Sequence, residues 1–387
     1  MENKRVMGEE VVVIVGAGQS GLAAAACLTE LSVPCVILER EDCIASLWRN
    51  RCYDRVSLHL QKQFCQLPHA PHPPETPMYI PKQDFIRYLE DYAARFRLRI
   101  NLQRKVESTK YDEEAGRWRL VATNGEDGSM EEYVARYVVV ATGENDEMVV
   151  PKIPGLEGFS GPVVHSSLYR SGSEYKGKSV LVVGCGNSGM EVALDLAENG
   201  ATTHIVVRNK FHIVTKEIWV KAMILSRLFP CKVVDAVILL LCHLEFGSLA
   251  KYGIRRPAKG PMYLKEHTPV YPVLDCGTVK KIKSGDIKVL PAIKHIEGND
   301  VTFSDGRTQH FDAIVLATGY RSTVKRWLKG DDSLIDETGM AKQTHPNNWK
   351  GRNGLYCAGL SRRGIYGSAE DALKIANDIG DDYKHTQ

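Results

Sequence analysis

The sequence predicts an α/β fold with two similar units, because one strand–turn–helix pattern occurs twice in its 387 residues. The first copy is the apolar run 11–15 followed by Gly16-Ala17-Gly18-Gln19-Ser20-Gly21. The second copy is the apolar run 180–183 followed by Gly184-Cys185-Gly186-Asn187-Ser188-Gly189. In such a turn the first glycine permits the bend, the second lets the backbone approach a pyrophosphate, and the third lets the helix pack closely on the strand. Two copies predict two Rossmann-like dinucleotide-binding domains whose ligands exchange electrons.

The residue that ends the second strand of each unit distinguishes the two ligands. The run 36–38 ends at Glu39, with Arg40 beside it, and a carboxylate there accepts hydrogen bonds from the ribose hydroxyls of an unphosphorylated adenosine. This pattern predicts FAD or NAD at the first site. The run 204–207 ends at Arg208, and a guanidinium there favours a 2′-phosphate, which predicts NADP at the second site. The alternative for Arg208 is a solvated charge at the end of a strand.

Composition limits the setting and the partners. With 43% hydrophobic and 25% charged residues, the chain is an ordinary globular protein large enough for two cores. The net charge is only +3 and the basic residues are scattered, so we expect no nucleic-acid partner. The ten cysteines include no C-x-x-C pair and no metal-like cluster with histidine, which predicts reduced thiols, no metal site and a cytoplasmic protein.

No segment of the sequence predicts a signal peptide or a membrane span. The first residues run directly into the first strand, without the apolar stretch of a signal peptide. The longest apolar run, 236–242, is too short to cross a bilayer. We expect it in a buried helix, and a surface that docks on an intracellular membrane is the alternative.

Repeated strand endings suggest how the domains are connected. Ala-Thr-Gly follows an apolar strand at 141–143 and again at 317–319, and the proline-containing segment 150–155 is typical of a linker. The sequence therefore predicts an NADP-binding domain at 150–312, inserted into a discontinuous FAD-binding domain at 1–149 and 313–387. It also predicts an amphipathic helix over 83–96, an irregular loop over the five prolines of 69–81, and a hairpin turn at 305–306.

The segment between the two domains resembles a known family. Phe159-x-Gly161-x-x-x-His165-x-x-x-Tyr169-Arg170 is similar to the identifying sequence of flavin-containing monooxygenases. The stretches 45–48, 53–60, 62–68 and 359–364 resemble the plant YUCCA branch of that family more narrowly. The resemblance covers nearly the whole chain. It implies tightly held FAD, NADPH and O2, and the conversion of the 2-oxo acid indole-3-pyruvate to the auxin indole-3-acetate through a C4a-peroxyflavin.

Two residues depart from the branch pattern, and a few others are candidates for the reaction site. Gln61 stands where the branch usually has proline and Tyr366 where it usually has leucine. Tyr366 is either part of the acceptor pocket or a loop variation. Because the cofactor carries the chemistry, the reaction needs no protein nucleophile.

The remaining candidates each have a plainer alternative. Asn145 and His59 are the catalytic candidates, and the alternatives are a turn residue and a packing residue. Trp48 packs either on the flavin or in the core. Arg362 and Arg363 hold a substrate carboxylate or a cofactor phosphate, or are solvated loop residues.

Three other functions share parts of this pattern. A flavin monooxygenase of amines or sulfides would carry the same cofactor sites. A disulfide reductase would need a redox-active cysteine pair, and the missing C-x-x-C argues against it. An inactive dinucleotide-binding interaction protein is disfavoured by two intact glycine turns. The sequence does not predict the oligomeric state.

Overall fold

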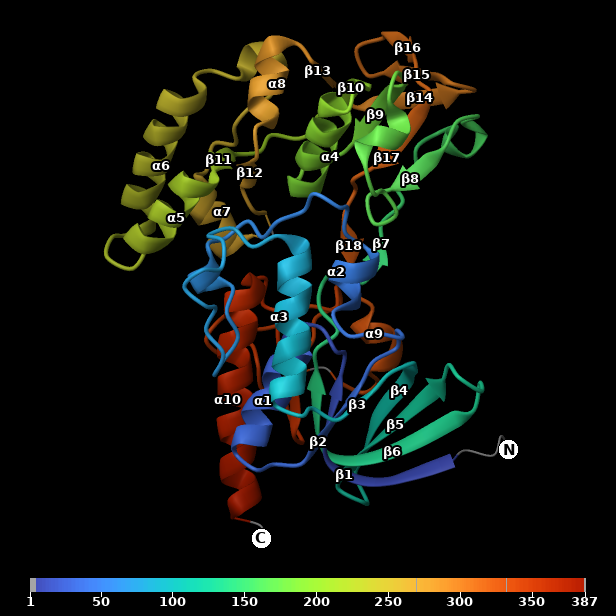
Figure 1. Ribbon diagram of the computed structural model, residues 1–387, viewed down its shortest axis with the longest axis vertical. Coiled ribbons are helices and arrows are strands. Elements are labelled where there is room, and N and C mark those ends of the chain that lie inside the picture. The colour runs from blue at the N-terminus through green and yellow to red at the C-terminus, as the bar shows by residue number, and fades with distance from the viewer. Residues whose placement is uncertain (1–4, 269, 332, 386–387) are drawn as a thin grey trace. The chain divides into compact units, whose positions relative to one another are not determined.

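A computed structural model describes residues 5–268, 270–331 and 333–385 (Figure 1). The chain forms two compact units. The first unit comprises Met1–Asn50, Gln61–Glu147 and Tyr320–Gln387, and the second comprises Arg51–Leu60 and Met148–Gly319.

The first unit is built on a seven-stranded sheet with the order β3-β2-β1-β6-β5-β4, in which β19 also pairs with β6. Strands β1 (Arg5–Val15), β2 (Cys35–Leu38), β3 (Ile100–Asn101), β6 (Met130–Val140) and β19 (Leu355–Cys357) run parallel. Strands β4 (Arg104–Asp112) and β5 (Arg117–Asn124) extend the sheet as an antiparallel meander from β6. The central segments of the parallel strands are apolar and buried, as expected where a sheet is covered on both faces: 12–15 of β1, 36–38 of β2, 138–140 of β6, and β19.

Helices cover this sheet. Helix α1 (Gln19–Glu30) is buried from Ser20 to Leu28 and lies along α10 (Gly364–Lys384), as Figure 1 shows. The other helices are α2 (Ser46–Asn50), η1 (Lys62–Phe64), α3 (Lys82–Arg95) and α9 (Val324–Trp327). Helix α3 confirms the helix predicted over 83–96, and the proline-rich loop 69–81 contains no helix or strand.

The second unit has a five-stranded parallel sheet with the order β13-β10-β9-β17-β8. Its strands are β8 (Val163–His165), β9 (Ser179–Val183), β10 (Thr202–Val206), β13 (Ile287–Leu290) and β17 (Ala313–Leu316). A three-stranded antiparallel sheet contains β14 (Ile293–Glu297), β15 (Asp300–Phe303) and β16 (Thr308–His310), and the turn between the last two confirms the hairpin predicted at 305–306. The strand after that turn is the short β16, and the chain then enters β17 in the main sheet.

Short elements complete the second unit. Strands β11 (Ile213–Thr215) and β12 (Val273–Asp275) pair in parallel, and β7 (Glu147–Met148) pairs with β18 (Tyr320–Arg321) where the chain passes from one unit to the other. The helices are η2 (Leu156–Gly158), η3 (Gly172–Tyr175), α4 (Asn187–Glu198), α5 (Lys216–Leu225), α6 (Cys231–Phe246), η4 (Ala250–Tyr252), α7 (Pro261–His267) and α8 (Thr278–Ser284). Within the described parts of the chain, no helix has the length and hydropathy needed to cross a bilayer.

The structure corrects three expectations. Segment 313–319 belongs to the second unit, because β17 forms parallel ladders with both β8 and β9. Segment 51–60 also belongs to the second unit, because its side chains find carboxylate partners on α4. The apolar run 236–242 lies in α6, which is only half buried: Ile238 is 1% exposed but Leu240 is 60% exposed.

Candidate functional site

The first glycine turn has the geometry of a pyrophosphate cradle. Gly16 has φ +106°, and a Cβ placed there would lie 2.8 Å from the Ala141 carbonyl oxygen. A Cβ at Gly21 would lie 1.9 Å from the Gly16 carbonyl oxygen, so this position holds α1 against the turn. A Cβ at Gly18 would meet nothing within 4 Å. The turn is therefore closed where helix and strand pack and open where a ligand would approach.

The start of α1 leaves donors for an anion. Gly18 is the N-cap residue, no side chain caps the helix, and the first turn carries no acidic residue. The first backbone N–H groups of a helix have no partner within the helix, and the helix dipole favours negative charge there. This arrangement fits the pyrophosphate of FAD.

Glu39 is held at the edge of the cradle. Its Oε2 accepts a hydrogen bond from the Ala17 N–H at 2.7 Å, and its Oε1 accepts one from the Glu41 N–H at 3.0 Å. The residue is 6% exposed, and burial raises the pKa of its carboxyl despite these hydrogen bonds. Each oxygen retains a lone pair, so the carboxylate can accept two further hydrogen bonds from a ribose.

Two other residues predicted to bind FAD, Trp48 and Arg40, have protein partners. Trp48 supports the glycine turn, and Arg40 is paired with carboxylates. Trp48 Nε1 donates to Gln19 Oε1 at 3.3 Å, and the Trp48 ring packs edge-on against Phe85. Arg40 forms ion pairs with Asp146 and Glu41, so its charge is balanced by protein carboxylates. Trp48 thus fixes Gln19 in the turn, and any contact with the flavin stays a prediction.

A contact that sequence reasoning missed brings the C-terminal part of the chain to the first turn. Ser20 Oγ donates to Ser368 Oγ in α10 at 2.8 Å. Gly359 has φ +78°, and a Cβ there would lie 2.2 Å from Ser20 Oγ. Gly359 therefore packs against the first turn, and its presence in the family-like stretch 359–364 was the sequence signal for this contact.

The second turn repeats the geometry of the first. Gly184 has φ +109°, and a Cβ there would lie 2.3 Å from the Ala317 carbonyl oxygen. A Cβ at Gly189 would lie 2.0 Å from the Gly184 carbonyl oxygen, whereas one at Gly186 would meet nothing within 4 Å. Asn187 Oδ1 accepts a hydrogen bond from the Leu274 N–H at 2.8 Å, which anchors strand β12 to this turn. The second cradle fits a second dinucleotide.

Polar residues around the second cradle differ from those around the first. Arg208 follows β10, is exposed, and forms no hydrogen bond or ion pair with any other described residue. Cys185 lies close enough for Arg208 to lower its pKa, but burial dominates and raises that pKa to about 11. Ser188 occupies the first turn of α4. An unpaired guanidinium beside the cradle is what recognition of a 2′-phosphate requires.

His59 lies in a cluster of the second unit. Its Nε2 is 2.6 Å from Glu191 Oε1 on α4, and Tyr53 Oη donates to Glu191 Oε2 at 2.5 Å. Burial alone would raise the pKa of Glu191, but hydrogen bonds from His59, Tyr53 and Cys276 outweigh it and lower that pKa to about 2. The predicted boundaries placed His59 in the FAD-binding domain, which was wrong, because segment 51–60 packs on α4 and belongs to the second unit. A catalytic role for His59 remains a prediction.

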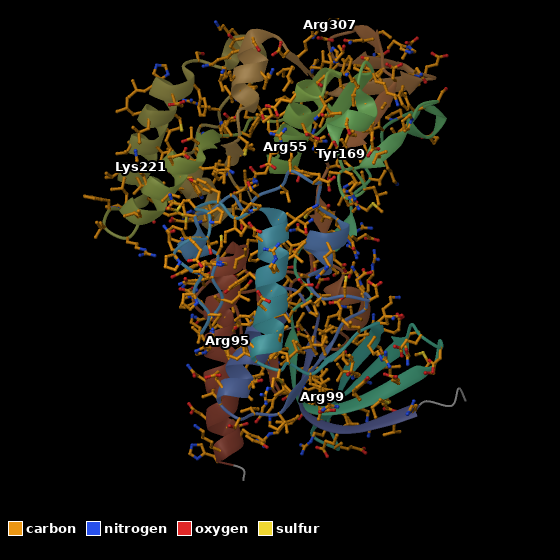
Figure 2. The ribbon with its side chains drawn as sticks, in the orientation of Figure 1. Arg55, Arg95, Arg99, Tyr169, Lys221 and Arg307 are labelled. Atoms are coloured by element: carbon orange, nitrogen blue, oxygen red, sulfur yellow. The ribbon has the colours of Figure 1, made fainter. Side chains whose placement is uncertain are left out.

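Two further contacts hold segment 51–60 on α4. Arg55 Nη1 donates to Glu198 Oε2 at 2.6 Å and to Asp195 Oδ1 at 3.4 Å. Tyr169 Oη donates to the other oxygen of Asp195 at 2.6 Å, and Figure 2 labels Arg55 and Tyr169 beside this helix. Two stretches that carry the family resemblance thus meet on one helix.

The remaining candidates lie in the first unit. Asn145 is exposed in the loop after β6. Its neighbour Glu144 is partly buried, and burial raises the pKa of that carboxyl although Arg362 opposes the shift. Arg363 forms an ion pair with Glu370 and lies over the Tyr366 ring, 5.6 Å from its centroid. Arg363 is therefore neutralised within α10. Gln61 is the N-cap residue of η1, makes no side-chain capping hydrogen bond, and accepts a hydrogen bond from the Gln63 side chain.

Comparisons with known proteins agree with this geometry. The family model described as pyridine nucleotide-disulphide oxidoreductase matches residues 13–238. A probable indole-3-pyruvate monooxygenase of Arabidopsis thaliana, YUCCA9, is 50% identical over 95% of this chain and 88% of its own length. An indole-3-pyruvate monooxygenase of Oryza sativa subsp. japonica, YUCCA1, is 48% identical over 95% of this chain and 90% of its own.

A solved structure supports the fold. The flavin-containing monooxygenase from Stenotrophomonas maltophilia aligns with a TM-score of 0.72 at 21% identity, and the alignment covers 98% of this chain and 100% of that chain. Three findings lead to one conclusion: the two dinucleotide cradles, the family model that matches more than half of the chain, and the relatives that are 48–50% identical to it. The chain belongs to the pyridine nucleotide-disulphide oxidoreductase family and, within it, to the YUCCA-type flavin-containing monooxygenases.

Proposed function

We propose that this protein oxidatively decarboxylates indole-3-pyruvate to indole-3-acetate, using NADPH and O2. The observation that carries the proposal is the pair of open cradles, one with a buried carboxylate and one with an unpaired arginine, in a chain half identical to a probable indole-3-pyruvate monooxygenase. The enzyme uses FAD and NADPH. Bound FAD would accept the hydride and activate oxygen.

The residues of the chain bind and orient in this proposal. The α1 N-terminus and Glu39 hold the two ends of the FAD adenosine diphosphate, and the turn at Gly186 with Arg208 holds NADPH. Arg362 is the cation that we assign to the 2-oxo acid carboxylate. It belongs to the loop that contacts Ser20, whereas Arg363 is already paired with Glu370.

A single turnover with the purified holoenzyme tests the proposal. The protein should be yellow, and NADPH should bleach the flavin absorption under anaerobic conditions. Adding O2 with indole-3-pyruvate should then release indole-3-acetate and CO2 in amounts equal to the NADPH consumed. Phenylpyruvate, a tertiary amine and a sulfide serve as competing substrates. Oxygenation of the amine or sulfide, with no decarboxylation, would replace this function by heteroatom oxygenation, and a colourless protein would contradict both.

We also propose a cytoplasmic enzyme that docks reversibly on an anionic membrane surface. All ten cysteines are free thiols, as expected in a reducing compartment. The apolar residues Val233, Val237, Leu240 and Leu244 form an exposed stripe along α6, which continues to Leu228 and Phe229. Three exposed basic residues lie beside this stripe: Lys221, labelled on α5 in Figure 2, Arg227 and Lys232. The exposed acidic residues Glu217 and Glu245 lie at its two ends in the sequence. An apolar face flanked by cations suits an interface rich in anionic lipid.

Sedimentation with lipid vesicles tests this docking. The protein should bind phosphatidylserine-containing vesicles and release them at high salt. Replacing Leu240 and Leu244 with serine should abolish binding, whereas Leu373→Ser, at an exposed leucine of α10, should not change it. Equal binding to neutral vesicles, or by the double variant, would overturn the proposal.

A further inference from the structure

Three potential metal ligands converge in the second unit from distant parts of the sequence. His59 comes from segment 51–60, Glu191 from α4, and Cys276 from the loop after β12. His59 Nε2 lies 2.6 Å and Cys276 Sγ lies 3.1 Å from the same oxygen, Glu191 Oε1, and all three atoms lie within 4.8 Å of one another. No local spacing in the sequence reveals this group, because its members are 132 and 85 residues apart.

The carboxylate is oriented as a ligand of a metal ion would be. Tyr53 donates to the other oxygen, Oε2, and so fixes the carboxylate plane and leaves Oε1 facing the imidazole and the thiol. Residues that orient a ligand in this way are a regular feature of metal sites. Glu191 is 5% exposed, whereas the His59 and Cys276 side chains are partly exposed and offer a path from solvent.

The donor set selects the type of ion. One imidazole nitrogen, one thiolate sulfur and one carboxylate oxygen suit Zn²⁺, whereas Mg²⁺ and Ca²⁺ prefer oxygen ligands only. Zinc bonds of about 2.0–2.3 Å in a tetrahedron separate neighbouring ligand atoms by about 3.3–3.7 Å. The observed spacings of 2.6 and 3.1 Å fall short of that by roughly 1 Å or less, so rotation of the partly exposed side chains can open the site.

We propose that His59 Nε2, Glu191 Oε1 and Cys276 Sγ form a Zn²⁺ site in the second unit, with water as the fourth ligand. Binding replaces the hydrogen bonds to Oε1 by bonds to the metal. The Cys276 thiol loses its proton to solvent, and the neutral His59 imidazole carries its proton on Nδ1, which leaves the Nε2 lone pair for the metal. The ion would join segment 51–60 and the loop after β12 to α4. Glu191 lies one helical turn beyond Asn187, so an occupied site would hold Cys276 directly after β12, the strand that Asn187 anchors through Leu274. This proposal does not depend on the substrate of the enzyme.

A competition titration with the holoenzyme tests the site. Wild-type protein should withdraw one equivalent of Zn²⁺ from a chromophoric chelator and release a proton. Cys276→Ser and His59→Gln should weaken the affinity at least about 100-fold, and Tyr53→Phe, which removes only the orienting hydrogen bond, about 10-fold. Cys231→Ser is the matched control, because Cys231 is also a partly buried thiol beside a carboxylate, that of Asp235. The Zn²⁺ affinity of this variant should equal that of the wild type.

Cobalt gives a second readout that does not require the variants to fold. Co²⁺ bound in place of zinc should show the red absorption bands of a tetrahedral site, at wavelengths where oxidised flavin does not absorb. Octahedral bands, or absence of bands in the wild-type protein, would overturn the proposal. Equal zinc affinities of wild type and a folded Cys276→Ser variant would also overturn it.

Discussion

Alanine substitutions at the second and third glycines of the second turn, which we assign to NADP, should separate ligand binding from folding. Gly186 has φ −73° and ψ −173°, which alanine adopts without strain, and its Cβ would meet no protein atom within 4 Å. The free energy of unfolding of Gly186→Ala should therefore stay within about 1 kcal/mol of wild type. The added methyl occupies the space through which a pyrophosphate approaches the backbone. An overpacking cost of about 1–3 kcal/mol would then weaken NADP⁺ binding by roughly 5- to 150-fold.

Gly189→Ala should show the opposite behaviour. Its Cβ would lie 2.0 Å from the Gly184 carbonyl oxygen, so α4 must move away from the turn by roughly 1.4 Å or more to reach an ordinary contact. This should lower the free energy of unfolding by about 1–3 kcal/mol or more. Calorimetric titration with NADP⁺ and thermal unfolding measure the two effects, and the FAD content is an internal control because the FAD cradle lies in the other unit. A Gly186→Ala variant with wild-type NADP⁺ affinity, or a Gly189→Ala variant with wild-type stability, would refute the reasoning.

Three more predictions concern single charged residues. Arg208→Ala should raise the KM for NADPH about 10- to 100-fold and leave the response to NADH unchanged, since only NADPH carries the 2′-phosphate; equal effects on both would exclude that role. Glu39→Ala should lower FAD content and leave NADP⁺ binding intact, and full FAD occupancy would contradict the ribose contact. Folding lowers the pKa of the Glu191 carboxyl from 4.5 to about 2. The ionised carboxylate therefore stabilises the fold fully above pH 4.5, and this stabilisation is lost as the pH falls from 4.5 to about 2. Wild type should exceed Glu191→Gln by about 3 kcal/mol in free energy of unfolding at pH 7, and by roughly half of that near pH 3; a gap that does not change with pH would reject the coupling.

Local sequence determined the two cradles and predicted the distinction between their ligands. A glycine turn and the residue ending the next strand lie within one strand–helix–strand unit, so their spacing alone fixes their positions relative to each other. That is why Gly16 to Gly21, Glu39, Gly184 to Gly189 and Arg208 are all recognisable in the amino-acid sequence. Helix α3 was predictable for the same reason, because its apolar residues repeat with the period of a helix.

Only the tertiary structure decided which distant segments meet. Segment 51–60 is flanked on both sides by residues of the first unit, yet Tyr53, Arg55 and His59 pair with carboxylates on α4, and no periodic pattern encodes such long-range pairs. The same holds for β17 in the second sheet, for Gly359 against Ser20, and for Cys276 against Glu191. The sequence by itself therefore determined what the protein binds, because binding turns are local. The fold decided which side chains surround those turns, because burial and hydrogen bonding between remote segments depend on how the whole chain packs.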